Sequence, residues 1–123
     1  MSGIPKQFLD QKYINLETYK KNGTIVKTPV WFVIANELIY VVTRKFTGKV
    51  KRLKNNSKVK ICSCSFNGKP KGEWLSGNMT LVDDDEAKTV ISLRKKKYGI
   101  KTILVGFVTK SKGKLIVYSI ILD

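Results

Sequence analysis

The chain has no histidine in 123 residues, only two cysteines and only nine acidic residues. Without histidine, imidazole is excluded as a general base, as the partner of a nucleophile and as a metal ligand. Cys62 and Cys64 supply two thiolates, whereas a closed zinc site takes about four ligands. We therefore expect no metal site, and we interpret the two cysteines as small core residues of one strand.

Long hydrophobic runs are also missing. No stretch approaches the roughly 20 apolar residues that span a bilayer, and residues 1–16 lack the apolar run of a signal peptide. We therefore expect a cytoplasmic protein with no membrane partner. A mass of 14.0 kDa and 42% hydrophobic residues fit one core, so residues 1–123 are expected to form a single domain.

The standard nucleotide-binding motifs are absent as well. No Gly-x-Gly-x-x-Gly follows an expected strand, and no Gly-x-x-x-x-Gly-Lys-Ser/Thr occurs. Serine and threonine hydroxyls have no histidine to activate them. The acidic run at 83–86 stands where a helix is expected to begin, which favours a capping role over a metal or acid/base site. No catalytic side chain can be named, so redox chemistry would have to come from a bound cofactor.

The sequence does contain abundant strand periodicity. Residues 12–19 alternate, Asn22-Gly23 is typical of a hairpin turn, and Pro29 predicts a bulge or an edge within the second strand. The first three strands are expected to form a meander. We predict a mainly β protein, a split β-barrel of about seven antiparallel strands in a Greek-key arrangement with two or three short helices. The expected strands are 12–19, 24–34, 38–42, 58–66, 73–82, 102–109 and 114–121.

Two segments change to helical periodicity. In 47–56, Thr47 is a candidate N-cap and Phe46, Val50 and Leu53 are expected to pack on the sheet. In 83–99, acidic residues open the helix, lysines close it and Gly99 follows it. One face of this second helix is expected to be buried, formed by Ala87, Val90, Ile91, Arg94 and Tyr98.

The formal charge of +15 predicts an anionic partner, and residues 41–60 alone carry eight Lys or Arg and no acidic residue. Within that stretch, Thr47-Gly48-Lys49 stands at the start of a helix, where free amides, the helix dipole and a lysine suit a phosphate. The alternative is a solvated basic helix start. Nucleic-acid readers place exposed aromatics among their basic residues, and the one aromatic here, Phe46, is assigned to the core, which argues against nucleic acid.

The motifs over residues 16–99, taken in order, resemble the pyridoxamine 5′-phosphate oxidase-like, flavin-binding split-barrel superfamily. They are most similar to its class that uses the 8-hydroxy-5-deazaflavin coenzyme F420. The motifs that carry the resemblance are LETYKKNG at 16–23, TPVWF at 28–32, TGKVKRL at 47–53, GEW at 72–74 and KYG at 97–99.

The resemblance implies a homodimer that binds two cofactors, F420 or FMN, at its interface. Thr47, Gly48 and Lys49 would hold the phosphate with Arg52 nearby. The ring system would lie along Thr28, Pro29 and Val30. Further residues are implied around it: Thr43 on the ribityl or phosphate side, Trp74 from the partner subunit, Arg44 or Lys45 as additional phosphate ligands, and Trp31 in core or dimer packing.

The implied function is an oxidoreductase that passes a hydride between F420 or FMN and a small-molecule substrate. The chain lacks the C-terminal extension with which pyridoxamine phosphate oxidases complete their substrate site, so a reaction other than that of vitamin B6 is expected. The alternatives are a flavin carrier without a substrate of its own and a basic nucleic-acid-binding barrel.

Overall fold

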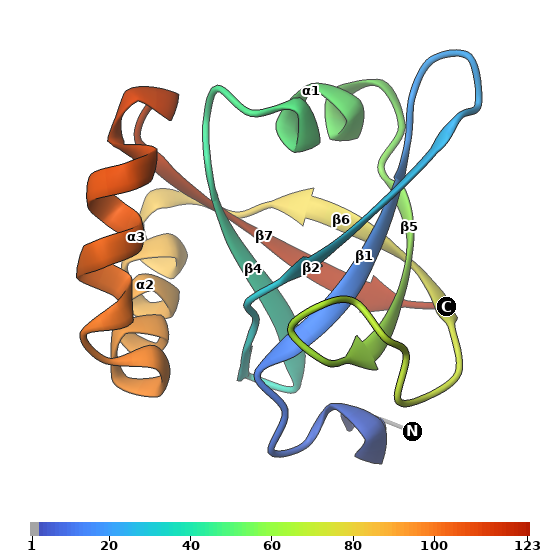
Figure 1. Ribbon diagram of the computed structural model, residues 1–123, viewed down its shortest axis with the longest axis horizontal. Helices are drawn as coiled ribbons and strands as arrows, with labels where there is room; N and C mark the ends of the chain where they lie inside the picture. The colour runs from blue at the N-terminus through green and yellow to red at the C-terminus, as the bar shows by residue number, and fades with distance from the viewer. Residues whose placement is uncertain (1–2) are drawn as a thin grey trace.

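The structure is a computed structural model that describes residues 3–123, and its centre is one antiparallel sheet of seven strands (Figure 1). The strand order is β2-β1-β5-β6-β7-β4-β3. The strands are β1 Tyr13–Tyr19, β2 Ile25–Val30, β3 Val33–Ala35, β4 Leu38–Arg44, β5 Lys58–Cys64, β6 Leu75–Leu81 and β7 Leu115–Leu122.

The two edges of the sheet are joined to each other in sequence, and this makes the sheet curl. β2 and β3 lie at opposite ends of the strand order, yet only Trp31 and Phe32 separate them. The predicted strand 24–34 is therefore two strands, of which the first pairs with β1 and the second with β4. Pro29 lies opposite Asn15 in the edge strand β2. Because no further strand pairs with the outer side of β2, the N–H that proline lacks is not required for a hydrogen bond there. The predicted split barrel is confirmed.

The predicted strand 102–109 is wrong, because this segment lies in the helix α3, Lys101–Thr109. A short apolar run does not by itself distinguish a strand from a helix. β7 pairs with β6 along one edge and with β4 along the other. Neither edge of β7 is therefore free to pair with residues 102–109 in a hairpin. The count of seven strands still holds because the segment 24–34 supplies two.

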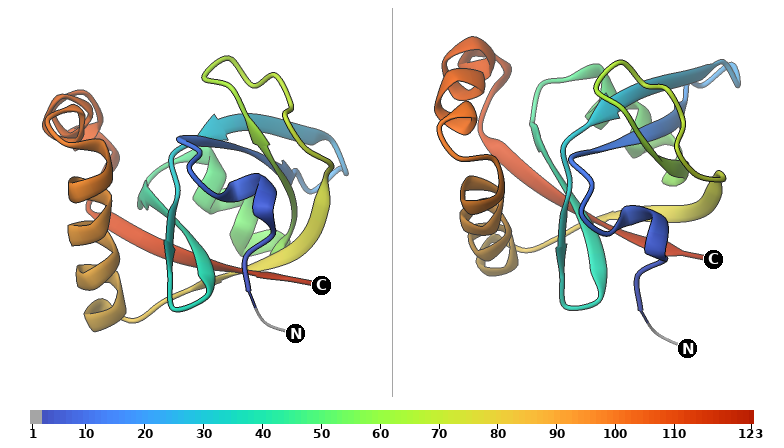
Figure 2. Two further views of the ribbon diagram at one scale, coloured as in Figure 1. Left: turned by 90° about the horizontal axis from the view of Figure 1, so that it is seen from below. Right: turned by 60° about the horizontal axis from the view of Figure 1, so that its bottom comes forward.

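Three α-helices complete the fold of residues 3–123. α1 (Gly48–Asn55) lies at one end of the barrel, whereas α2 (Asp84–Tyr98) and α3 follow one another on its outside and run in different directions (Figure 2). Two short 3-10 turns are formed by Lys6–Phe8 and Lys110–Lys112. The predicted caps are present: Thr47 accepts from the Val50 amide at 3.4 Å, and Asp83 accepts from the Glu86 amide at 2.8 Å. Val90 and Tyr98 are the buried residues of α2, in agreement with its predicted face.

The interior is apolar, and α1 packs into it through Val50 and Leu53. Cys62 and Cys64 are buried and free, as expected. Phe46 is a correction, since its side chain is 66% exposed rather than in the core. The Phe46 amide donates to the Lys112 carbonyl at 2.7 Å, which holds the residue in a turn outside the barrel. Because Phe46 is an exposed aromatic residue among basic ones, it no longer counts against nucleic-acid binding.

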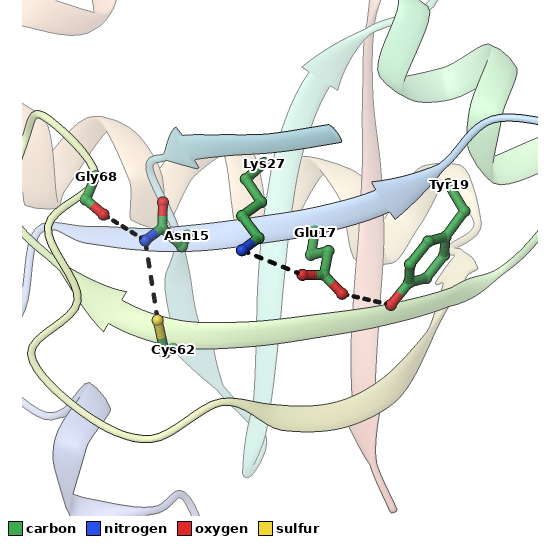
Figure 3. Close-up of polar contacts among 6 residues, drawn as sticks. All are labelled: Asn15, Glu17, Tyr19, Lys27, Cys62 and Gly68. Carbon is green, nitrogen blue, oxygen red and sulfur yellow. Dashed lines mark hydrogen bonds and ion pairs between the residues drawn. The ribbon is translucent and has the colours of Figure 1, made fainter. Parts of the chain in front are cut away.

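The outer face of β1 carries a buried polar cluster (Figure 3). Glu17 accepts a hydrogen bond of 2.6 Å from the Tyr19 hydroxyl and forms an ion pair of 3.9 Å with Lys27, the one salt bridge within residues 3–123. Burial and the adjoining Glu17 carboxylate raise the pKa of Tyr19 to about 12. Asn15 donates to the Gly68 carbonyl at 2.6 Å, which ties the β5–β6 loop to this face.

Candidate anion site at the start of α1

The first turn of α1 presents free backbone donors. Thr47 Oγ1 accepts from the Val50 amide and also donates to the Arg44 carbonyl at 3.1 Å, which fixes the turn that enters the helix. The first amides of an α-helix have no intrahelical acceptor, so those of Gly48 and Lys49 point out along the positive end of the helix dipole. This arrangement suits an anion.

Arg52 lies directly over this turn. Its Nε donates to Thr18 Oγ1 of β1 at 2.7 Å, and a Cβ added to Gly48 would approach Arg52 Nη1 to 2.9 Å. Glycine at position 48 therefore lets the guanidinium come close to the backbone. Within residues 3–123, Nε is the one nitrogen of Arg52 with a hydrogen-bond acceptor, so both terminal nitrogens remain for a bidentate contact with an oxyanion.

Lys49 places a second cation beside Arg52. Burial lowers the pKa of the Lys49 ammonium, and the positive charge of Arg52 lowers it further. No carboxylate compensates the pair, because the one ion pair within the described part of the chain joins Glu17 to Lys27. An anion bound between Lys49 and Arg52 would relieve their repulsion.

The surface beside this turn is concave and basic. A hollow of about 350 Å³ is lined by Lys20, Lys21, Gly48, Lys51, Arg52 and Asn55. A neighbouring hollow of about 450 Å³ shares Lys20 and Lys21 and is also lined by Lys58 and Lys60. The turn between β1 and β2 and the helix α1 therefore form one positively charged end of the barrel.

The structure brings together four of the predicted site residues, namely Thr47, Gly48, Lys49 and Arg52. Sequence reasoning missed Lys20, Lys21 and Thr18. The motif LETYKKNG contains all three, but nothing local indicates that its turn folds against α1.

The other predicted residues lie elsewhere on the barrel. Thr28 and Val30 are opposite Leu16 and Ile14, and Thr43 is opposite Ile116, so all three share the interior face. Pro29 and Trp74 lie on or beside the outer face, where Lys27 Nζ is 5.1 Å from the Trp74 ring centroid. Contacts of these residues with a cofactor remain predictions that depend on a second subunit.

Arg44, the alternative phosphate ligand, is occupied at the end of α3. Its Nε donates to Thr109 Oγ1 at 3.2 Å and its Nη1 to the Gly113 carbonyl at 3.1 Å. Lys45, the other alternative, is exposed and its Nζ lies 5.8 Å from the Phe46 ring centroid.

A second set of contacts fixes the break between β2 and β3. The Tyr98 hydroxyl accepts from the Phe32 amide at 3.1 Å and lies 2.7 Å from the Lys12 carbonyl, to which it donates. Burial raises the pKa of Tyr98 to about 12. Trp31 stacks on the Tyr98 ring at 4.3 Å with an interplanar angle of 8°, and Arg94 lies 5.3 Å from the Trp31 ring. Trp31 therefore packs within its own chain.

Lys97, the neighbour of Tyr98, should titrate near pH 8. Its Nζ donates to the Phe32 carbonyl at 2.9 Å and lies 3.7 Å from the Phe32 ring centroid, and burial lowers its pKa to about 8. The unfolded state then holds more protons than the folded state between about pH 8 and pH 10, so this group makes folding more favourable as pH rises through that window. NMR of reductively ¹³C-methylated protein should show one lysine signal titrating near pH 8 that is absent in Lys97→Met. A Lys97 signal that titrates with the bulk lysines would contradict the expectation.

A curled sheet of seven antiparallel strands with three helices, whose first helix begins at a basic turn, defines the class of this protein as a small split-barrel domain. The family model described as pyridoxamine 5′-phosphate oxidase matches residues 5–119, and the chain belongs to this family. Comparison with curated proteins gives no significant match.

Solved structures show the same fold at low sequence identity. HutZ, the heme storage protein from Vibrio cholerae, is 14% identical with a TM-score of 0.69, covering 93% of this chain and 83% of its own. A structure named F420 reductase is 16% identical with a TM-score of 0.63, covering 98% of this chain and 96% of its own. A pyridoxamine 5′-phosphate oxidase-related, FMN-binding protein from Nostoc punctiforme is 18% identical with a TM-score of 0.50, covering 65% of this chain and 43% of its own.

Proposed function

We propose that this protein is a flavin- or deazaflavin-dependent oxidoreductase whose cofactor, FMN or F420, is held by its phosphate at the start of α1. The observation that carries the proposal is the uncompensated pair of Lys49 and Arg52 in the first turns of α1, with Arg52 over Gly48. The family match supports it, as do structural relatives that include an F420 reductase and an FMN-binding protein.

The residues present fit a phosphate group. A Cβ at position 48 would meet Arg52, so glycine keeps open the space between backbone and guanidinium. The Gly48 and Lys49 amides and the free Arg52 nitrogens would donate to phosphate oxygens, and the Lys49 ammonium would supply a full charge. When bound, the cofactor supplies hydride transfer, and the protein supplies position and electrostatics.

We further propose that the active form is a homodimer in the cytoplasm, with the ring system along Thr28, Pro29 and Val30 and with Thr43 toward the phosphate side. Trp74 would approach the cofactor of the partner subunit. The break after Val30 supports this arrangement, since the backbone leaves the β1 ladder there before it joins β4. The substrate would be a small molecule that lies against the exposed ring face.

Heme binding is the second candidate, because HutZ is a heme storage protein. This chain has no histidine to serve as an axial ligand, and both of its cysteines are buried. The phosphate site instead favours FMN or F420. A flavin carrier without catalysis uses the same site, and a nucleic-acid-binding barrel would use the same basic surface.

Titration of the purified protein, freed of nucleic acid, separates these functions. We expect FMN or F420 to bind with a change in cofactor fluorescence, and the bound cofactor to be reduced or reoxidised by an electron donor or acceptor. The same protein is titrated in parallel with hemin and with single-stranded DNA, which test the two other binding functions. The proposal fails if neither flavin binds while hemin or DNA does, and binding without redox turnover would identify a carrier.

A further inference from the structure

The outward face of α3 is apolar and uncovered. Its large side chains follow the spacing i, i+3, i+4, i+7 and i+8, which places them on one side of the helix. No residue of α3 is buried. The exposed fractions are 74% for Ile100, 51% for Ile103, 62% for Leu104, 81% for Phe107 and 82% for Val108.

Contacts on the opposite face hold this stripe outward. Arg44 donates to Thr109 Oγ1 at 3.2 Å and to the Gly106 carbonyl at 3.5 Å. Rotation of α3 that buried its apolar stripe would break these two of the three hydrogen bonds that the partly buried Arg44 guanidinium makes. The hydrogen bonds of Arg44 therefore fix the orientation of α3 in which its apolar stripe faces solvent.

Phe46 extends the apolar surface. It lies beside the end of α3, where its amide donates to the Lys112 carbonyl and a Cβ added to Gly113 would approach its ring to 2.7 Å. Its side chain is 66% exposed. We call the set of Phe46, Ile100, Ile103, Leu104, Phe107 and Val108 the α3 patch.

Exposed lysines accompany the α3 patch in sequence and in space. Residues 87–122 contain no Asp or Glu. The lysines that adjoin members of the patch or the turn beside Phe46 are Lys45, Lys101, Lys110, Lys112 and Lys114, and all five are exposed.

We propose that the α3 patch docks this protein on an anionic phospholipid bilayer, contrary to the expectation from the sequence that it has no membrane partner. Apolar side chains on a helix that lies in the interface enter the acyl boundary, while nearby lysines meet the negative headgroups of a cytoplasmic leaflet. Within residues 3–123 no helix is long and apolar enough to cross a membrane, and α3 has only nine residues. The helix therefore lies on the bilayer and does not span it.

Charge favours a lipid surface over a second copy of this chain. A second copy docked through the same patch would bring its lysines against those of the first, with no carboxylate from residues 87–122 to pair with them. The side chains of the α3 patch carry no hydrogen-bonding group. Apart from Phe46, which precedes the N-cap of α1, the patch lies on α3 and its N-cap, outside the barrel, whereas the proposed cofactor site is at α1 (Figure 1). The inference uses no contact with the cofactor.

The test is cosedimentation with phosphatidylcholine vesicles, with and without phosphatidylserine. We expect binding to the mixed vesicles and little to phosphatidylcholine alone. Phe107→Ser should weaken binding about tenfold, because part of the apolar gain of burying the ring is lost. Phe66→Ser is the matched control, since Phe66 is 74% exposed but lies in the β5–β6 loop.

The contribution of charge is tested by lysine variants. Lys110→Gln with Lys112→Gln should also weaken vesicle binding, whereas Lys58→Gln with Lys60→Gln should weaken it less.

Phe107→Trp gives an independent readout, because its fluorescence should shift to the blue and be quenched by brominated lipid on mixed vesicles. Thermal unfolding of each variant checks that the fold is retained, as expected for exposed positions. The proposal is overturned if Phe107→Ser and Phe66→Ser bind vesicles equally. Vesicle binding would then depend on the charge of the protein and not on the α3 patch. It is also overturned if no vesicle binding occurs while Phe107→Ser abolishes a concentration-dependent association of the protein with itself.

Discussion

Replacing Arg52 with alanine should weaken the binding of FMN or F420 by about 10- to 100-fold, because a hydrogen bond to a charged group contributes about 1.5–3 kcal/mol. Arg52 is held over Gly48 by its bond to Thr18, so its free nitrogens are positioned before the ligand arrives. Fluorescence titration of wild type and variant with the same cofactor measures the ratio of dissociation constants.

Two matched variants make the result specific to geometry. Arg52→Lys keeps the charge but loses the planar fork, so its affinity should fall between those of wild type and Arg52→Ala. Lys54→Ala removes an exposed lysine from the last turn of the same helix and should leave affinity nearly unchanged. Equal losses in Arg52→Ala and Lys54→Ala would mean that diffuse surface charge, rather than this site, attracts the cofactor.

The same titration repeated across pH gives a second readout, which depends on Lys49. Burial and the charge of Arg52 lower the pKa of Lys49, so its proton is lost at a lower pH than that of an ordinary lysine. Affinity for the anionic cofactor should therefore fall as pH rises through that lowered pKa. Lys49→Arg, which stays charged, should bind with a flatter pH dependence.

Replacing Tyr98 with phenylalanine should lower the free energy of unfolding by about 1–3 kcal/mol, the cost of leaving a buried polar group without a partner. The Tyr98 hydroxyl is the acceptor for the amide of Phe32, a residue that is 1% exposed, and it also donates to the Lys12 carbonyl. The variant keeps the ring and its stacking on Trp31, so the loss reports the hydroxyl alone. Urea unfolding followed by circular dichroism measures it.

Tyr13→Phe is the control for this substitution. Tyr13 is half-buried, and its hydroxyl has no hydrogen-bond partner within residues 3–123, so the variant should change stability little. An effect in Tyr98→Phe no larger than that in Tyr13→Phe would show that the break between β2 and β3 does not depend on the Tyr98 hydroxyl.

Much of the fold followed from local signals. Alternation predicted β1, Thr47 and Asp83 marked the starts of α1 and α2, and Pro29 indicated a bulge or an edge. These features depend on residues near one another in the chain, where hydrogen-bonding options and side-chain periodicity are fixed by sequence. Thr47-Gly48-Lys49 does form the first turn of α1, as its local signals indicate, whereas anion binding at this turn stays a prediction.

The sequence by itself determined the strand-rich character of this protein, its basic charge, its lack of imidazole chemistry and the capped, basic turn at which α1 begins. The tertiary structure alone decided that 24–34 joins the two edges of one sheet and that 102–109 is a helix, because β7 already has a neighbour on each side. It also decided that Arg52 lies over Gly48 and that Phe46 and α3 face outward. Pairing partners and solvent exposure depend on residues far apart in the chain, and such contacts leave no local pattern.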